Sequence, residues 1–221
     1  MKLYMSEGAI WIMLLIYTPL ALLALWGLWK TLSRQGTVRV SVMLFAVGIA
    51  TLLPTWDVLT TSYQMAQLCP TAGLRVRKSV EVEGYLTNFG GNLGEISHEG
   101  FSYIESQTRS DTLSLFKQHD GKVLETIIDL RKTAYPIKSR YEYRYGSGEK
   151  LEGALNIAKA HSLVIDRATQ EILGEAVSYT AFPGWIDRNS IQRLGNFSWS
   201  CPEKSAISAD LLEQTLRPAR R

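Results

Sequence analysis

A long stretch without formal charge near the N-terminus constrains this chain more than any other sequence feature. Between Glu7 and Lys30 the residues are mostly Leu, Ile, Ala, Met and Trp, and none carries a formal charge. As a helix, this stretch would extend about 33 Å at ~1.5 Å per residue, enough to cross a hydrocarbon core of roughly 30 Å. A membrane helix also tolerates Pro19, near the middle, better than a soluble helix does. We therefore expect a membrane-spanning helix over residues 8–29.

A second uncharged stretch at residues 40–56 predicts a second spanning helix. It would extend about 26 Å, at the short end of the spanning range, and Trp56 would anchor its far end at the membrane interface. Residues 1–56 are thus expected to form a transmembrane helical hairpin. The alternative is a cleaved signal peptide, which has a basic segment before a shorter apolar core. Here Glu7 precedes the first stretch and the basic residues follow it.

The distribution of charge gives the expected orientation of this hairpin. The chain has 24 Lys and Arg against 21 Asp and Glu, a formal charge of +3. Residues 1–56 hold four basic residues and one acidic residue, so 4 − 1 = +3 and the rest of the chain is neutral. A neutral folded part gives no support to nucleic-acid binding. Lys30, Arg34 and Arg39 lie between the two apolar stretches, and the positive-inside tendency places that loop in the cytoplasm and both termini outside.

The two cysteines agree with this orientation. Cys69 and Cys201 both lie in residues 57–221, one near the beginning of that segment and one near its end. Outside the reducing cytoplasm such a pair forms a disulfide. The alternative is two unrelated buried thiols. We expect residues 57–221 to be an extracytoplasmic domain that this disulfide closes.

The pattern of apolar residues predicts that this outer domain is an α+β domain built mainly on an antiparallel β-sheet. Alternating residues predict strands, and Asp120-Gly121 between two apolar runs is typical of a β-hairpin. A polar turn at residues 166–170 predicts a second hairpin. The expected strands cover residues 75–86, 100–106, 112–118, 122–129, 139–145, 158–165 and 172–180, with short helices at 57–68 and 209–216.

Several segments of the outer domain resemble small uncharacterised bacterial membrane proteins that pair an N-terminal membrane anchor with a β-rich outer domain. The resemblance lies in Cys69, Gly73–Val76, Val80–Tyr85, Lys138–Tyr141 and Asp166–Glu175. It includes no motif of known chemistry, so it implies no catalytic residue. It implies a setting in the bacterial cytoplasmic (inner) membrane. Together with the two expected spans and their orientation, this predicts a multi-pass protein with the outer domain in the periplasm.

The sequence contains no catalytic or metal-binding motif that we recognise. The three histidines, His98, His119 and His161, are isolated, so we expect neither a metal nor a cofactor. Residues 88–94 are rich in Gly and Asn but lack the Lys and Ser/Thr of a phosphate-binding loop. Acidic residues close in sequence leave a glycosidase-like carboxylate pair open; they are Glu81, Glu83, Glu95, Glu99 and Glu105.

The most distinctive local pattern is the alternation of Tyr141, Tyr143 and Tyr145 along one expected strand. The simpler interpretation is a strand face packed on the core, with the hydroxyl groups at its edge. The alternative is an exposed aromatic strip that binds a partner, since aromatic residues are enriched at binding surfaces. Trp185, in a Pro-Gly loop, would extend that strip.

These features favour a membrane-anchored periplasmic binding or accessory module, part of an envelope complex, over an enzyme. Its expected partners are the lipid bilayer and a protein in the membrane or periplasm. One alternative is a membrane-anchored immunity or exclusion protein that acts against a toxin or a phage. A second is an envelope-acting hydrolase whose carboxylates the sequence does not make recognisable.

Overall fold

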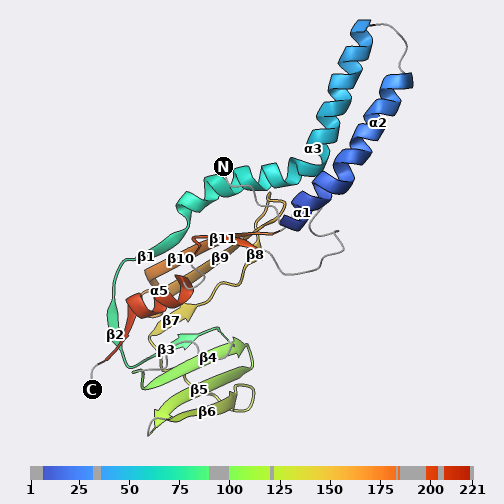
Figure 1. The fold of residues 1–221 in the computed structure, drawn as a ribbon. Helices are drawn as coiled ribbons and strands as arrows, with labels where there is room; N and C mark the ends of the chain where they lie inside the picture. Colours follow the sequence, from blue (N-terminus) through green and yellow to red (C-terminus); the bar gives the residue numbers. More distant parts are fainter. Residues whose placement is uncertain are drawn as a thin grey trace. The chain divides into compact units, whose positions relative to one another are not determined.

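The computed structural model of the 221-residue chain describes residues 7–31, 36–89, 100–119, 122–182, 184, 198–203 and 207–219 (Figure 1). The chain forms two compact units. The first contains residues 1–68, 150–158 and 180–199, and the second contains residues 69–149, 159–179 and 200–221. Two later segments thus belong to the same unit as the N-terminal helices, and the domain boundary expected near residue 57 stays a prediction.

The N-terminal apolar stretch is helical and contains a local widening before Pro19. It consists of α1 (Glu7–Ile12), a π-helical turn (Met13–Tyr17) and α2 (Thr18–Thr31). Both the backbone N–H and the hydroxyl of Thr18 donate to the carbonyl of Met13, the hydroxyl at 2.7 Å. A π turn of this kind accommodates a proline, which has no N–H to donate. Residues Ile10–Thr31 are long and apolar enough to cross a membrane, and none of this segment is buried.

The second apolar stretch lies at the start of a long helix, α3 (Gly36–Leu68), which is bent. The axes of Val40–Ala50 and Thr55–Thr71 differ by 61°. Pro54 lies in the break and cannot donate a backbone hydrogen bond. The helix before the break is roughly 22 Å long, shorter than a hydrocarbon core. One helix, not two, therefore meets the length and apolarity of a span by itself.

The last part of α3 is amphipathic. The helix predicted over residues 57–68 is present and continues directly from the second apolar stretch. Val58 and Met65 are buried, and Thr61 and Ser62 lie on the same buried face. The Nε2 of Gln64 donates to the carbonyl of Gly153 at 3.3 Å, which connects α3 to a later segment of the same unit.

A ten-stranded sheet accounts for most of the remaining described residues. Its main path has the order β1-β10-β9-β7-β3-β4-β5-β6, with β11 beside β10 and β8 beside β9. The strands are β1 (Gly73–Val76), β3 (Gly84–Thr87), β4 (Tyr103–Arg109), β5 (Thr112–His119), β6 (Lys122–Asp129), β7 (Tyr141–Arg144), β8 (Glu149–Lys150), β9 (Ile157–Asp166), β10 (Glu171–Ala181) and β11 (Trp199–Cys201).

The sheet is mixed, since it contains parallel pairs as well as the expected antiparallel ones. The local neighbours β4/β5 and β5/β6 are antiparallel, as are β1/β10 and β7/β9. Strand β3, in contrast, is parallel to both β4 and β7. The hairpin predicted around Asp120-Gly121 is confirmed by the pairing of β5 with β6, although the two turn residues lie outside the described part of the chain. Parallel neighbours require long connections, which local sequence patterns do not reveal.

The strand predicted over residues 75–86 is divided into three. It contains the end of β1, the short strand β2 (Val80–Val82) and β3. Strand β2 leaves the main sheet and pairs in parallel with β12 (Leu216–Pro218) at the C-terminus. The C-terminal helix predicted over residues 209–216 is present as α5 (Ile207–Thr215).

Helix α5 covers one face of the sheet and closes the core of the second unit (Figure 1). A Cβ added at Gly174 of β10 would lie 2.7 Å from Thr215 Oγ1 and 2.8 Å from Leu211 Cδ1, so a glycine is needed where the helix meets this strand. The cluster of buried apolar residues comprises Val82, Tyr85, Phe101, Ile104, Tyr143, Val164, Leu173, Ala176, Ile207, Leu211, Leu212 and Leu216.

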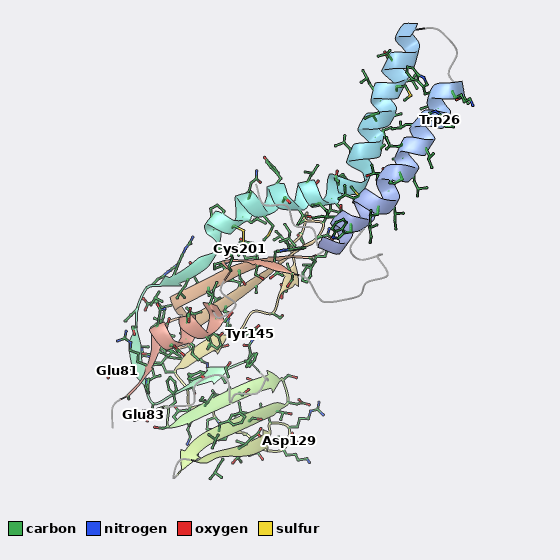
Figure 2. All side chains as sticks on the ribbon, viewed as in Figure 1. Trp26, Glu81, Glu83, Asp129, Tyr145 and Cys201 are labelled. Atoms are coloured by element: carbon green, nitrogen blue, oxygen red, sulfur yellow. A yellow bond between two sulfur atoms is a disulfide. The ribbon has the colours of Figure 1, made fainter. Side chains whose placement is uncertain are left out.

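Cys69 and Cys201 lie at disulfide distance, as the sequence predicts. Their sulfur atoms are 2.08 Å apart and their Cα atoms 5.5 Å apart (Figure 2 labels Cys201). The bond connects the 3₁₀ turn after α3 to strand β11, across a sequence separation of 132. It therefore closes most of the second unit, apart from the segment that contains α5, into one covalent loop.

Replacing both cysteines, Cys69→Ser with Cys201→Ser, should destabilise the second unit strongly. The chain-entropy model assigns roughly 4 to 5 kcal/mol to a loop of this length. Thermal unfolding of the full chain in detergent would measure the effect as a lowered Tm. Wild-type protein treated with a reductant should melt at the temperature of the double variant. Equal Tm values for the oxidised wild type and the double variant would contradict this expectation.

Candidate functional site

The three alternating tyrosines do not form one exposed strip. Tyr143 is 2% exposed and its hydroxyl donates to the carbonyl of Ser208 at 3.1 Å. Burial raises the pKa of Tyr143 to about 12, against the opposing effect of hydrogen bonds with Ser162 and Ser208. Tyr141 is half-buried and packs against the same core, whereas Tyr145 is 38% exposed. The core interpretation therefore describes Tyr143 and Tyr141, and Tyr145 alone remains available to a partner.

Tyr145 forms an aromatic pair with Phe89. Their ring centroids are 4.9 Å apart and the ring planes make an angle of 67°, an edge-to-face arrangement. Phe89 is half-buried and Tyr145 is the more exposed ring. Figure 2 labels Tyr145. An exposed tyrosine held against a second ring presents an apolar surface beside a hydroxyl group, a combination common at binding surfaces.

The ends of two parallel strands place this aromatic pair. Strands β3 and β7 pair through Thr87 and Tyr143. Strand β3 ends at Thr87, and β7 ends one residue after Tyr143. The side chain of Asn88 then continues the pairing. Its Nδ2 donates to the carbonyl of Tyr145 at 3.0 Å, and its Oδ1 accepts from the N–H of Tyr145 at 2.6 Å. Both bonds go to the backbone of Tyr145, so they fix where the residue lies without involving its ring.

Two neighbouring contacts complete the support of the aromatic pair. The Oγ of Ser106 donates to the carbonyl of Phe89 at 2.8 Å, from the adjacent strand β4. On the other side, Gly146 lies against the backbone of His161, where an added Cβ would be 2.1 Å from the carbonyl oxygen. The glycine is therefore required for the chain to pass so close to β9 directly after Tyr145.

The acidic residues singled out from the sequence do not form a described carboxylate pair. Glu81 and Glu83 are exposed (Figure 2), whereas Glu105 is completely buried. Glu95 and Glu99 lie outside the described residues. The two oxygens of Glu105 accept the backbone N–H groups of Lys138 and Ser139 at 3.0 and 2.8 Å. Glu105 therefore attaches the segment between β6 and β7 to the sheet.

A second buried carboxylate, Asp166, lies at the start of the β9–β10 turn. Its side chain is 5% exposed and accepts hydrogen bonds from Arg140 Nε at 3.0 Å and Arg140 Nη2 at 2.7 Å. It also accepts the backbone N–H of Ala168 at 2.9 Å. These hydrogen bonds, with that from Arg140 the largest, lower the pKa of Asp166 below its ordinary value. The turn predicted at residues 166–170 is thus fixed by an ion pair within the sheet.

A looser charged cluster surrounds Glu175 of β10. Its carboxylate oxygens are 3.6 Å from Arg75 Nη1, 3.8 Å from Arg77 Nη2 and 3.5 Å from His161 Nε2. These separations exceed those of direct charge-assisted hydrogen bonds. Glu175 is thus beside an imidazole and two guanidinium groups. Among the described residues, no group of three or more His, Cys, Asp or Glu side chains is arranged to hold a metal ion.

The remaining candidate residues are described only in part. Lys30 lies over the ring of Trp26, with its Nζ 5.0 Å from the centroid. Arg39 is in α3, but only its backbone is described, as is that of His119 in β5. Trp185, Arg34 and His98 lie outside the described residues. The partner-binding role expected for Trp185 and the topology-determining role expected for Arg34 therefore stay predictions.

Sequence reasoning missed Phe89 and Asn88 as site residues. The sequence pattern alone places both in the Gly- and Asn-rich loop at residues 88–94. The only sequence signal for this site is weak. It is the Asn directly after a buried strand, because an Asn side chain can form the backbone hydrogen bonds that the next residue of a strand would otherwise form.

Replacing Arg140 with Ala should destabilise the protein at neutral pH and have less effect in acid. The pKa of Asp166 is lowered in the folded state, so the ion pair adds stability above the unfolded pKa of about 3.9. That contribution is lost as the pH falls through the folded pKa. The difference in Tm between wild type and Arg140→Ala should therefore shrink from pH 6 towards pH 2.

The matched control for this pH series is Arg131→Ala. Arg131 is 76% exposed and contacts Asp111 at 2.7 Å, and exposed pairs contribute little to stability. Its Tm should stay close to that of the wild type throughout. A difference for Arg140→Ala that is independent of pH would show that the arginine acts through packing instead.

Comparison of the chain with protein-family models, with curated proteins and with solved structures gives no match. The aromatic pair, the ion pairs and the apolar helix are therefore interpreted from their own geometry and chemistry.

Proposed function

We propose that this chain is a membrane-anchored protein of the bacterial envelope, whose β-rich part lies outside the cytoplasm and serves as a binding or accessory module. One observation carries the proposal: an unburied apolar helix, Ile10–Thr31, occurs in the same chain as the Cys69–Cys201 disulfide. An apolar helix exposed along its length is stable in lipid rather than in water. Disulfides persist in oxidising compartments such as the periplasm.

The proposal includes two membrane-inserted helices rather than one. The hydroxyl of Tyr17 donates to the carbonyl of Ala50, so the π-helical turn that precedes α2 and the first part of α3 are joined within the apolar region. Figure 1 shows these two helices side by side as a hairpin. The side chains before the break in α3 include Leu44 and Phe45, 68% and 72% exposed. The exposed Trp56 follows the break, where an aromatic residue favours the membrane interface.

The orientation follows from the basic loop of this hairpin. Lys30 lies in the last turn of α2, and Arg34 and Arg39 follow it in the sequence. Basic residues favour the cytoplasmic side, so both termini and the β-rich part would lie in the periplasm. The inner membrane is the proposed location because it borders both compartments.

The aromatic pair Phe89–Tyr145 is the proposed contact surface for a protein partner. It combines an exposed ring with a backbone that Asn88 fixes, so binding would require little ordering of the surface. Its neighbour Tyr143 serves the core instead.

Reporter fusions should show that the C-terminus lies outside the cytoplasm. An enzyme that is active only after periplasmic disulfide formation, fused after Arg221, should be active. The same enzyme inserted at Gln35 should be inactive. Replacing Lys30, Arg34 and Arg39 together with Gln should reduce the difference, because the orienting charge is removed. Activity at Gln35 and inactivity at Arg221 would reverse the proposed orientation.

The same preparations distinguish an anchor from a cleaved signal sequence. An anchored chain extracted from membranes keeps its full mass and its N-terminal segment. A shortened chain in the soluble periplasmic fraction would refute the anchor.

A photo-crosslinking residue placed at Tyr145 should capture a partner in intact cells. We expect one covalent adduct of defined mass, because the surface is small and fixed. The matched control is the same residue at Tyr63, which is 59% exposed and lies in α3. In a second experiment the photo-crosslinking residue replaces Phe89. Adding the substitution Tyr145→Ala to that chain should reduce the amount of adduct. No adduct at Tyr145 or Phe89 beyond that at Tyr63 would contradict a binding role for the aromatic pair.

A further inference from the structure

Strand β6 forms an outer edge of the main sheet. It is the last strand in the order and pairs with β5 along its whole length, from Lys122 to Asp129 (Figure 1). Within the described ranges, no strand pairs with its other side. Edge strands expose a row of unpaired N–H and C=O groups, which provides a template for another strand.

The side chains of β6 are unusually apolar for such an edge. Val123, Leu124 and Ile127 are 47%, 54% and 68% exposed. Because side chains alternate along a strand, Leu124 lies on one face of the sheet and Val123 and Ile127 lie on the other. The strand contains no proline, and its pairing with β5 is regular from end to end. Charged side chains remain at Glu125 and Asp129, and these determine which partner fits.

We propose that β6 is a self-association surface at which two copies of the chain pair antiparallel, extending both sheets into one. A two-fold axis perpendicular to the sheet keeps each residue on its own face. Opposed residues in an antiparallel pair also share a face. Their residue numbers must therefore be both even or both odd, which restricts the allowed registers.

Charge and the length of the overlap together select one register. With Glu125 opposite its own copy, two carboxylates meet directly. With Ile127 opposite its own copy, Glu125 faces Asp129 on both sides of the axis. With Thr126 at the axis, residues 123–129 pair, no two acidic residues are opposed, and Leu124 faces Ile128. Registers centred nearer either end of β6, such as those on Leu124 or Ile128, also keep the acidic residues apart, but they pair fewer residues. Opposed like charges destabilise strand pairs, whereas apolar and Thr–Thr pairs stabilise them. The charge pattern of β6 therefore fits a second copy of itself in the Thr126-centred register.

Pairing of β6 with β6 also limits the assembly to two copies of the chain. The other edge of the sheet, β1, is a short strand that contains Arg75. Pairing of β6 with β1 of another copy would join unlike edges and generate an open chain, whereas a β6–β6 pair is a closed dimer. A single pair of short strands buries less than a standard interface of about 1,200 Å² or more. The dimer should accordingly be reversible, and crosslinking is the appropriate way to detect it.

The test uses the full chain in native membrane vesicles with the variant Thr126→Cys. At the proposed axis the two introduced thiols face each other, so mild oxidation should give a reducible dimer linked through position 126, identified by peptide mass. The matched control is Ser114→Cys. Ser114 pairs with Ile127 but lies one strand inside the edge, on β5, too far from its own copy to be linked. A dimer fraction for Thr126→Cys no greater than that for Ser114→Cys would overturn the proposal.

Two further substitutions identify the contact. Leu124→Lys in the Thr126→Cys chain should lower the crosslinked fraction about tenfold, because the Leu124–Ile128 contact occurs twice in the dimer. Val76→Lys is its control on the opposite edge; Val76 is also exposed, at 38%. Ile127→Asp should also lower the crosslinked fraction, because it places an acidic residue opposite Glu125 of the other copy. A second variant of this kind shows that the loss does not come from misfolding of one variant. Loss of crosslinking with Val76→Lys, or no loss with both β6 variants, would contradict the β6–β6 pairing.

Discussion

The sheet depends on the complete burial of its central strand, β3. All four of its residues, Gly84 to Thr87, are buried, and they are parallel to a neighbour on each side. A Cβ at Gly84 would lie 2.3 Å from the carbonyl oxygen of Tyr103, so the close approach of β4 requires glycine there. Strand β3 thus joins the β4–β5–β6 meander to the strands under α5. The position of the aromatic pair Phe89–Tyr145 is determined by the point where β3 ends.

The local parts of this fold could be predicted from the sequence, whereas the parallel pairings could not. The β5–β6 hairpin follows from alternation around a two-residue turn, and the helix α5 follows from its apolar spacing. Strand β3 was expected to continue from residue 75, because an alternating pattern does not mark where a chain leaves a sheet. The bend in α3 likewise escaped prediction, since hydropathy measures apolar length and not direction.

The candidate site shows the same limit at the level of single residues. Alternation predicts that Tyr141, Tyr143 and Tyr145 share a face, but it does not show where the strand ends or which residues α5 contacts. Tyr143 donates to Ser208 of α5, whereas Tyr145 lies beyond the end of β7. The support from Asn88 is a contact between residues 57 apart in the chain, so no local pattern contains it. The pairing of Cys69 with Cys201 could be predicted because the chain has only two cysteines.

The Cys69–Cys201 bond also affects what proteolysis would do to this protein. Cys69 follows α3 almost directly, and most of the second unit lies between the two cysteines. A protease that cuts once within that loop produces two fragments that the bond still holds together. The C-terminal fragment then stays attached to the N-terminal helices. Damage to an exposed connection therefore leaves both pieces at one place, instead of releasing half of the domain.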